Sequence, residues 1–152
     1  MTCLHLPPVP ASAGAARRWA APLLSAELLS ADVRDPIILV VSELVTNAVA
    51  AEEAVGAVDD IGIELDVDPA GRYVTLSVTD ASDRPLPAIP QAVPGNEDHG
   101  RGLLLLHALA CRHGWVPRPC GGKCVWAFFR CTPAAERSDL GATEPSPCLA
   151  TQ

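Results

Sequence analysis

One helical stretch of the sequence carries two polar residues whose types and spacing suit acid–base and metal chemistry. The segment "ELVTNAV", residues 43–49, places Glu43 and Asn47 one helical turn apart, and Asn47 projects toward the apolar side of the helix. A carboxamide oxygen is a ligand for a hard cation such as Mg²⁺. A carboxylate one turn away can take a proton from an attacking hydroxyl or water. The alternative is structural: an Asn on an apolar face hydrogen-bonds to a neighbouring backbone group.

A carboxylate also ends a predicted strand on its core side. Val74, Leu76 and Val78 alternate with polar residues, and continuing that alternation aims Asp80 at the core. There it can accept a hydrogen bond from an exocyclic amine such as that of adenine. With Ser82, Asp80 can instead form an Asx-type turn, which has no functional meaning.

Two glycines open a third segment of interest, "GRGLLLLHALACRHG". Gly100 and Gly102 would let backbone N–H groups approach phosphates at the N-terminus of a helix. The long Pro-rich loop before them, residues 81–99, suits a lid. A single G-x-G also fits a plain loop exit. Taken together, the three features predict a nucleotide site with Mg²⁺.

Periodicity and punctuation predict the elements that position these residues. Asp35 and Pro36 fit the cap and the first position of the helix that holds Glu43, which should run to about residue 54. Ser12 fits the cap of an earlier helix that should run towards Ser30 and that Pro22 should kink or split. The remaining expectations are an edge strand at 3–6, a hairpin at 61–68 and 73–79 around a 69–72 turn, and a closing hairpin at 115–118 and 123–130.

Composition limits the function classes. The chain has 152 residues and a net charge of −7, which argues against a sequence-independent grip on nucleic acid. Seven acidic residues and no basic one fall between Glu52 and Asp68. A solvated face and turn explains them, and a docking surface for a basic partner is the alternative. No apolar run approaches the roughly 18 residues of a membrane span, and no signal peptide is recognisable, so we expect a soluble cytoplasmic protein.

Six cysteines in a chain with ample core and no export signal are interpreted as free thiols. Zinc is the alternative. Cys120 and Cys124, with Cys111 and His113 nearby, are suitable ligand types. Their spacing does not form a paired C-x-x-C, and they fall in strand-like sequence.

Three motifs together resemble the GHKL ATPases. "ELVTNAV" (43–49), "DASDRP" (80–85) and "HGRGLLLL" (99–106) are similar to the N box and the first and second glycine boxes of that superfamily. "GGKCVWAFF" (121–129) and "ASAGAARRW" (11–19) resemble the last strand and first helix of one group within it. That group is the stand-alone bacterial anti-sigma-factor serine kinases, the RsbW-like and SpoIIAB-like proteins. The resemblance spans about residues 3–131.

The resemblance implies a fold and a set of site residues. The fold would be an α+β, two-layer α/β sandwich, with helices on one face of a mixed, mostly antiparallel sheet. One ATP-binding domain would occupy 1–131, and 132–152 would be a disordered tail. Glu43 would be the general base, Asn47 the Mg²⁺ ligand and Asp80 the adenine contact. The cofactor-binding set would be completed by Ser82, Gly100, Arg101, Gly102, Leu103 and Cys124.

The resemblance also implies a function, with departures that leave an alternative open. The protein would phosphorylate a serine of an anti-sigma-factor antagonist and bind a sigma factor. Homodimers occur among the relatives, so a homodimer is a further expectation. However, "DASDR" replaces the usual D-x-G-x-G, and Cys124 replaces a common Thr or Ser. A partner-binding switch that uses nucleotide weakly or not at all is therefore the second hypothesis. A histidine-kinase catalytic domain ranks below it, because no helical hairpin with a phosphoacceptor His precedes Asp35.

Overall fold

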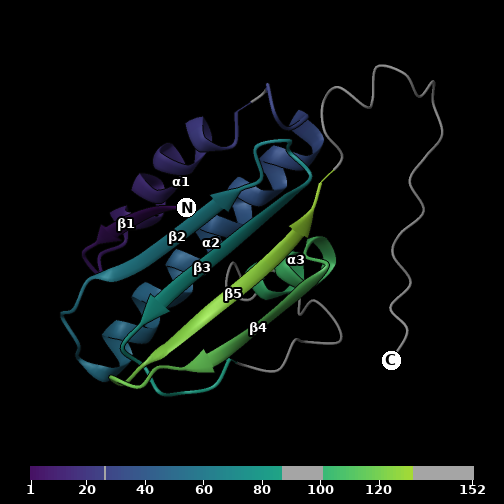
Figure 1. Cartoon of the computed structure of the whole chain (residues 1–152). Coiled ribbons are helices and arrows are strands. Elements are labelled where there is room, and N and C mark those ends of the chain that lie inside the picture. The colour runs from purple at the N-terminus through teal and green to yellow at the C-terminus, as the bar shows by residue number, and fades with distance from the viewer. Residues whose placement is uncertain (26, 87–100, 132–152) are drawn as a thin grey trace.

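The computed structural model describes residues 1–25, 27–86 and 101–131 (Figure 1). The predicted tail at 132–152, Gly100 and most of the loop expected to act as a lid lie outside them.

Strands and helices form two layers (Figure 1). Within the described ranges, five strands pair antiparallel in the order β1-β2-β3-β5-β4, and three helices cover one face of the sheet. This is the expected two-layer α/β sandwich, with a sheet that is antiparallel at every pairing. No helix in this part of the chain is long and apolar enough to cross a membrane. In chain order the elements are β1 Thr2–Leu6, α1 Ala11–Leu23, α2 Ala31–Val55, β2 Ile61–Val67, β3 Tyr73–Asp80, α3 Arg101–Leu109, β4 Arg112–Pro117 and β5 Lys123–Arg130.

The core lies between the sheet and the helices. Alternate residues of β3 and β5 are buried beneath α2, whose own buried positions are mostly apolar. Burial of this kind contributes roughly 25 cal/mol per Å² of apolar surface. The hairpin of β2 and β3 agrees with the alternation in the sequence. Strand β5 lies between β3 and β4, as expected for a strand that is apolar on both faces.

Helix α2 begins earlier than its sequence punctuation predicts. Its N-cap is Ser30, whose carbonyl accepts the first helical hydrogen bonds. The prediction that Asp35 caps the helix is wrong, because the helix begins at Ala31 and Asp35 lies within it, where its carboxylate contacts Arg34 Nε at 2.9 Å. Pro36 lies inside the helix, where it costs one backbone hydrogen bond. The helix ends at Gly56, which takes the left-handed conformation with φ 66°.

Helix α1 differs from expectation at both ends. It starts at Ala11, and the Ser12 hydroxyl donates to the carbonyl of Pro7 at 2.6 Å instead of capping the helix. It stops at Leu23, one residue after Pro22. The proline therefore lies in the last turn and marks the end of the helix.

The turn between β2 and β3 contains a buried carboxylate. Asp68 is 4% exposed and accepts hydrogen bonds from the backbone N–H and the guanidinium of Arg72. The hydrogen bond from the Arg72 side chain lowers the pKa of Asp68 to about 2. The prediction that the acidic segment is a solvated face is therefore wrong for Asp68. It is also wrong for Glu52, which is 0% exposed.

We predict that protonation of Asp68 lowers the free energy of unfolding in acid. A carboxyl whose pKa is depressed on folding stabilises the native state fully above its ordinary pKa of 3.8. That contribution is lost as pH falls through the folded value of about 2. Urea unfolding across this pH interval should show that the free energy of unfolding declines more steeply for the wild type than for Asp68→Asn. Asp35→Asn, on an exposed carboxyl, is the control and should follow the wild type. Equal declines for wild type and Asp68→Asn would contradict the assignment.

Candidate functional site

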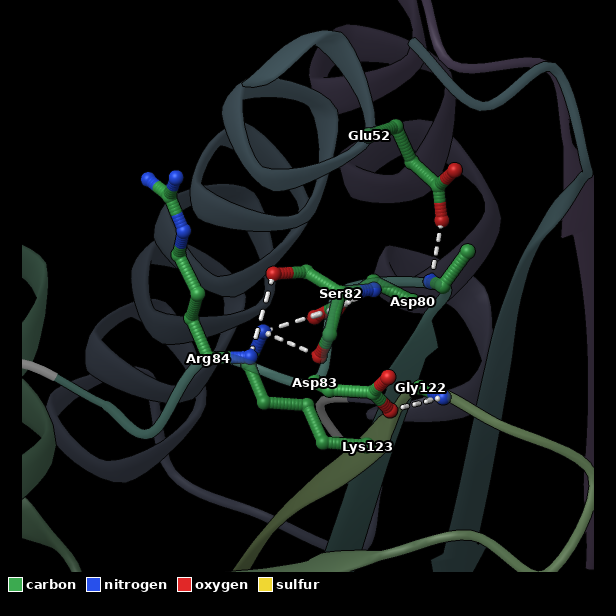
Figure 2. Close-up of polar contacts among 8 residues, drawn as sticks. Glu52, Asp80, Ser82, Asp83, Arg84, Gly122 and Lys123 are labelled. Atoms are coloured by element: carbon green, nitrogen blue, oxygen red, sulfur yellow. Dashed lines mark hydrogen bonds and ion pairs between the residues drawn. The ribbon is translucent and has the colours of Figure 1, made fainter. Parts of the chain in front are cut away.

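A buried ion pair joins the end of β3 to the start of β5. Asp80 and Lys123 are cross-strand partners on the face of the sheet that carries the helices. They are 4% and 5% exposed, and Lys123 Nζ lies 2.7 Å from Asp80 Oδ1 (Figure 2). Charges this well buried are costly unless each has a partner, so the two residues depend on each other.

The loop after β3 is bound to the same ion pair. Ser82 N–H donates to Asp80 Oδ1 at 2.9 Å, which forms the Asx-type turn that the sequence offered as an alternative. Lys123 Nζ also donates to the Ser82 carbonyl at 3.2 Å, and Arg84 N–H donates to the Ser82 hydroxyl at 3.3 Å. Ser82 is 1% exposed, so its role in the described structure is to shape this loop.

Two further contacts fix the loop to its neighbours. Glu52, near the end of α2, accepts a hydrogen bond from Ala81 N–H, and Asp83 accepts one from Gly122 N–H at 2.7 Å (Figure 2). Gly122 has φ 78°, and a Cβ there would lie 2.0 Å from the Asp80 carbonyl oxygen. Only glycine lets the β4–β5 turn approach so closely. Side-chain hydrogen bonds therefore hold a loop that lacks the glycines of D-x-G-x-G.

Glu43 and Asn47 lie on one flank of α2, and both are half-buried. Arg17 of α1 donates to the Ser42 hydroxyl, which identifies the flank that faces α1. At 3.6 residues per turn, Glu43 and Asn47 are rotated from Ser42 by about 100° and about 140°. Helices α1 and α3 lie on opposite sides of α2, so this rotation turns both residues toward the α3 side (Figure 1). Neither side chain makes a hydrogen bond or ion pair with another described residue.

The second glycine motif is only partly within the described residues. Helix α3 begins at Arg101 and contacts α2. Leu103 is 8% exposed and packs in the core. Arg101 and Gly102 form the first turn of the helix, where N–H groups have no intrahelical partner. Gly100 lies outside the described residues.

Cys124 is placed away from the other predicted site residues. It pairs across the sheet with Thr79, one residue before Asp80, so its side chain points to the face without helices. Burial raises the pKa of its thiol, and the neighbouring Ser77 hydroxyl opposes that rise. Its neighbour Lys123 lies on the helix-covered face and contacts Asp80, because the side chains of a strand alternate between its two faces.

The cysteines that the structure describes are free thiols. Cys131 is buried, and burial raises its pKa to about 11. The described residues contain no group of three or more His, Cys, Asp or Glu side chains arranged to hold a metal ion.

Sequence reasoning missed two residues of this region, Lys123 and Glu52. Lys123 is in phase with Val125 and Ala127, so the strand alternation contained the signal for its burial. Glu52 follows Val45 and Ala48 at helical spacings of seven and four, the positions of the buried stripe. Both were overlooked because a charged residue in a buried phase is normally assigned to an exposed edge or end.

The residues present fit an adenine nucleotide. Asp80 uses Oδ1 for Lys123 and Ser82, while its Oδ2 has no hydrogen-bond partner among the described residues. An acceptor therefore remains for an exocyclic amine. Asn47 offers an uncommitted amide oxygen on the α3 flank of α2, where a hard cation would find an oxygen ligand.

Comparison with known families agrees with this geometry. The chain matches the histidine kinase-like ATPase domain over residues 6–129, which is most of its length. The chain therefore belongs to the histidine kinase-like ATPase family, within the GHKL superfamily. Membership implies ATP binding, the activity class predicted from the three motifs. No curated protein matches the chain significantly.

We predict that the Asp80–Lys123 pair dominates local stability. Lys123→Met leaves the Asp80 carboxylate buried without its cation, which should reduce the free energy of unfolding by about 3–5 kcal/mol. Asp80→Asn/Lys123→Met removes both charges and should be more stable than Lys123→Met alone. Urea denaturation of the two single variants and the double variant measures the coupling. Strictly additive losses would show that the two charges do not depend on each other.

Proposed function

We propose that this chain is an ATP-dependent protein serine kinase of the anti-sigma-factor type. It would phosphorylate a serine of an antagonist protein and sequester a sigma factor. The observation that carries the proposal is the position of Glu43 and Asn47, one turn apart and uncommitted on the α3 side of α2. The kinase specificity rests on the motif resemblance, and membership in the ATPase family supports nucleotide use.

Each residue has a defined role in the proposed reaction. Asn47 would hold Mg²⁺, which neutralises negative charge on the phosphates. Asp80 Oδ2 would accept the adenine amine and so orient the nucleotide. Glu43 would accept the proton of the substrate serine as its oxygen bonds to the γ-phosphorus, while the bond to the β–γ bridging oxygen breaks and ADP leaves. Helix α2 fixes the spacing of base and metal ligand, which is the positioning that phosphoryl transfer requires.

The first turn of α3 would complete this site. The N-terminus of a helix favours an anion, and α3 packs against α2, the helix that bears Glu43 and Asn47. A phosphate chain between the two helices would therefore contact a metal ligand on one side and backbone donors on the other.

One observation favours a second candidate function, a partner-binding switch that needs nucleotide weakly or not at all. The carboxylate expected to recognise adenine is already bound by Lys123 and Ser82. The loop behind it is held by Glu52 and Asp83. If this fixed loop must rearrange to accept a base, the hydrogen bonds that hold it would have to break, and that cost would lower nucleotide affinity.

We predict that Asn47→Ala weakens Mg-ATP binding about tenfold or more, which corresponds to about 1.4 kcal/mol. The physical reason is the loss of the protein oxygen that holds the metal. Isothermal titration calorimetry measures the affinity. Thr46→Ala, on the exposed face of the same helix, is the control and should bind as the wild type does. If neither the wild type nor Asn47→Ala binds Mg-ATP, the partner switch replaces the kinase.

We predict that Glu43→Gln retains ATP binding and loses phosphoryl transfer by about 10²-fold or more, the usual contribution of a general base. Transfer of labelled phosphate from ATP to a purified antagonist protein gives the rate, with a serine-to-alanine antagonist as the negative control. Glu53→Gln, an exposed carboxyl on the same helix, provides the matched variant. Transfer at the wild-type rate in Glu43→Gln would show that Glu43 is not the base.

A further inference from the structure

A pocket of about 320 Å³ lies at the end of the sheet, beside the segment that carries Asp80. It is bounded by the end of α2, the approach to β2, the end of β3 and the β4–β5 turn. Five acidic side chains and one basic side chain line it, namely Glu52, Asp59, Asp60, Asp80, Asp83 and Arg118. The kinase proposal uses only Asp80 among them.

Glu52 is an unusual residue in this pocket. Its side chain is 0% exposed, and Oε1 accepts one hydrogen bond from Ala81 N–H. Oε2 is buried and has no hydrogen-bond partner in the described part of the chain. A carboxylate has about four acceptor sites, so Glu52 is far from satisfied. A buried polar atom without a partner is costly and calls for an explanation, such as a ligand.

The remaining charges do not offset this one, since Arg118, the basic side chain of the lining, forms no ion pair with another described residue. Asp80 is balanced by Lys123, and Asp83 is held by Gly122 N–H. Asp59 and Asp60 are exposed and form no ion pair with another described residue. The pocket therefore has negative charge at its rim and an unsatisfied carboxylate oxygen in its wall (Figure 2 shows Glu52 and Asp83).

We propose that this pocket binds the guanidinium group of an arginine side chain from a partner protein. A guanidinium is planar, always charged, and carries five N–H donors that match carboxylates at fixed angles. A rotation of the Glu52 carboxylate that turns Oε2 into the pocket would let one edge of the guanidinium donate to it, and Asp59 and Asp60 would surround the charge. The volume suits a side chain with a stem, and it is much larger than a metal ion needs. Glu52, Asp59 and Asp60 of the acidic segment would then form a docking surface for a basic partner.

This inference does not depend on kinase activity, since it uses neither Glu43 nor Asn47. The pocket is nevertheless linked to the loop after β3 that would contact adenine. Glu52 accepts a hydrogen bond from Ala81 N–H, next to Asp80. A bound arginine would therefore contact the wall that fixes the loop.

The test is a titration of the isotopically labelled full chain with the peptide acetyl-Gly-Arg-Gly-amide, followed by NMR. The control peptide contains citrulline, which has nearly the shape of arginine without its charge. We expect saturable shifts of the backbone amides of Ala81, Gly121 and Gly122, with affinity for the arginine peptide about fivefold or more higher. Equal affinities, or an absence of shifts at these amides, would overturn the proposal. A response of the same amides to Mg²⁺ at lower concentration than to the peptide would also overturn it, in favour of a metal.

Substitutions test whether the arginine peptide binds in this pocket. Asp59→Asn/Asp60→Asn changes only exposed rim residues and should weaken the arginine peptide about threefold or more. Asp35→Asn/Glu53→Gln removes two exposed charges outside the pocket and should leave binding unchanged. Glu52→Gln, with its fold verified from the amide spectrum, should weaken binding further. Equal effects of the two double variants would reduce the result to net charge and overturn the site. A parallel titration with ATP separates this outcome from failure of the kinase proposal.

Discussion

The buried pairing of Asp80 with Lys123 is the constraint on which the candidate site depends. It joins two neighbouring strands at the end where the helix-covered face of the sheet meets the loop after β3. Ser82 takes its conformation from both partners, through its own N–H and its carbonyl. Because each charge is buried, neither residue can be moved or removed alone at low cost. The position of the carboxylate is therefore fixed before any ligand arrives.

Helix α2 serves two chemical regions from one rigid element. Its middle presents Glu43 and Asn47 on the flank toward α3, where a nucleotide and its metal are expected. Its last turns present Glu52, which holds the loop through Ala81 N–H and contributes an unsatisfied oxygen to the acidic pocket. An apolar stripe on the same helix buries it against the sheet, and that packing holds the polar groups in place. The apolar residues of "SELVTNAVAA" therefore fix the helix against the sheet, and this fixes the positions of its polar residues.

The loop after Asp80 illustrates how side chains replace glycine. Hydrogen bonds that Glu52, Asp83 and Ser82 accept from backbone N–H groups fix a path that a glycine-rich motif would leave more adaptable. Nearby, Gly122 is needed for a different reason, since any side chain there would meet the Asp80 carbonyl. Membership in the histidine kinase-like ATPase family is compatible with this arrangement. In this chain the carboxylate proposed to recognise adenine is therefore held in a preformed, charge-balanced arrangement.

The sequence by itself determined the features that depend on local periodicity. The β2–β3 hairpin, the apolar face of α2, the phase of Asp80 and the one-turn spacing of Glu43 and Asn47 all follow from residue spacing, and the motifs identified the superfamily. Tertiary structure decided what depends on distant partners. Helix α2 extends back to Ala31 past a favourable cap at Asp35. Lys123, and not Cys124, meets Asp80, because the register between β3 and β5 decides which side chains face each other. Glu52 and Asp68 are buried because Ala81 and Arg72 supply hydrogen bonds that no local pattern reveals.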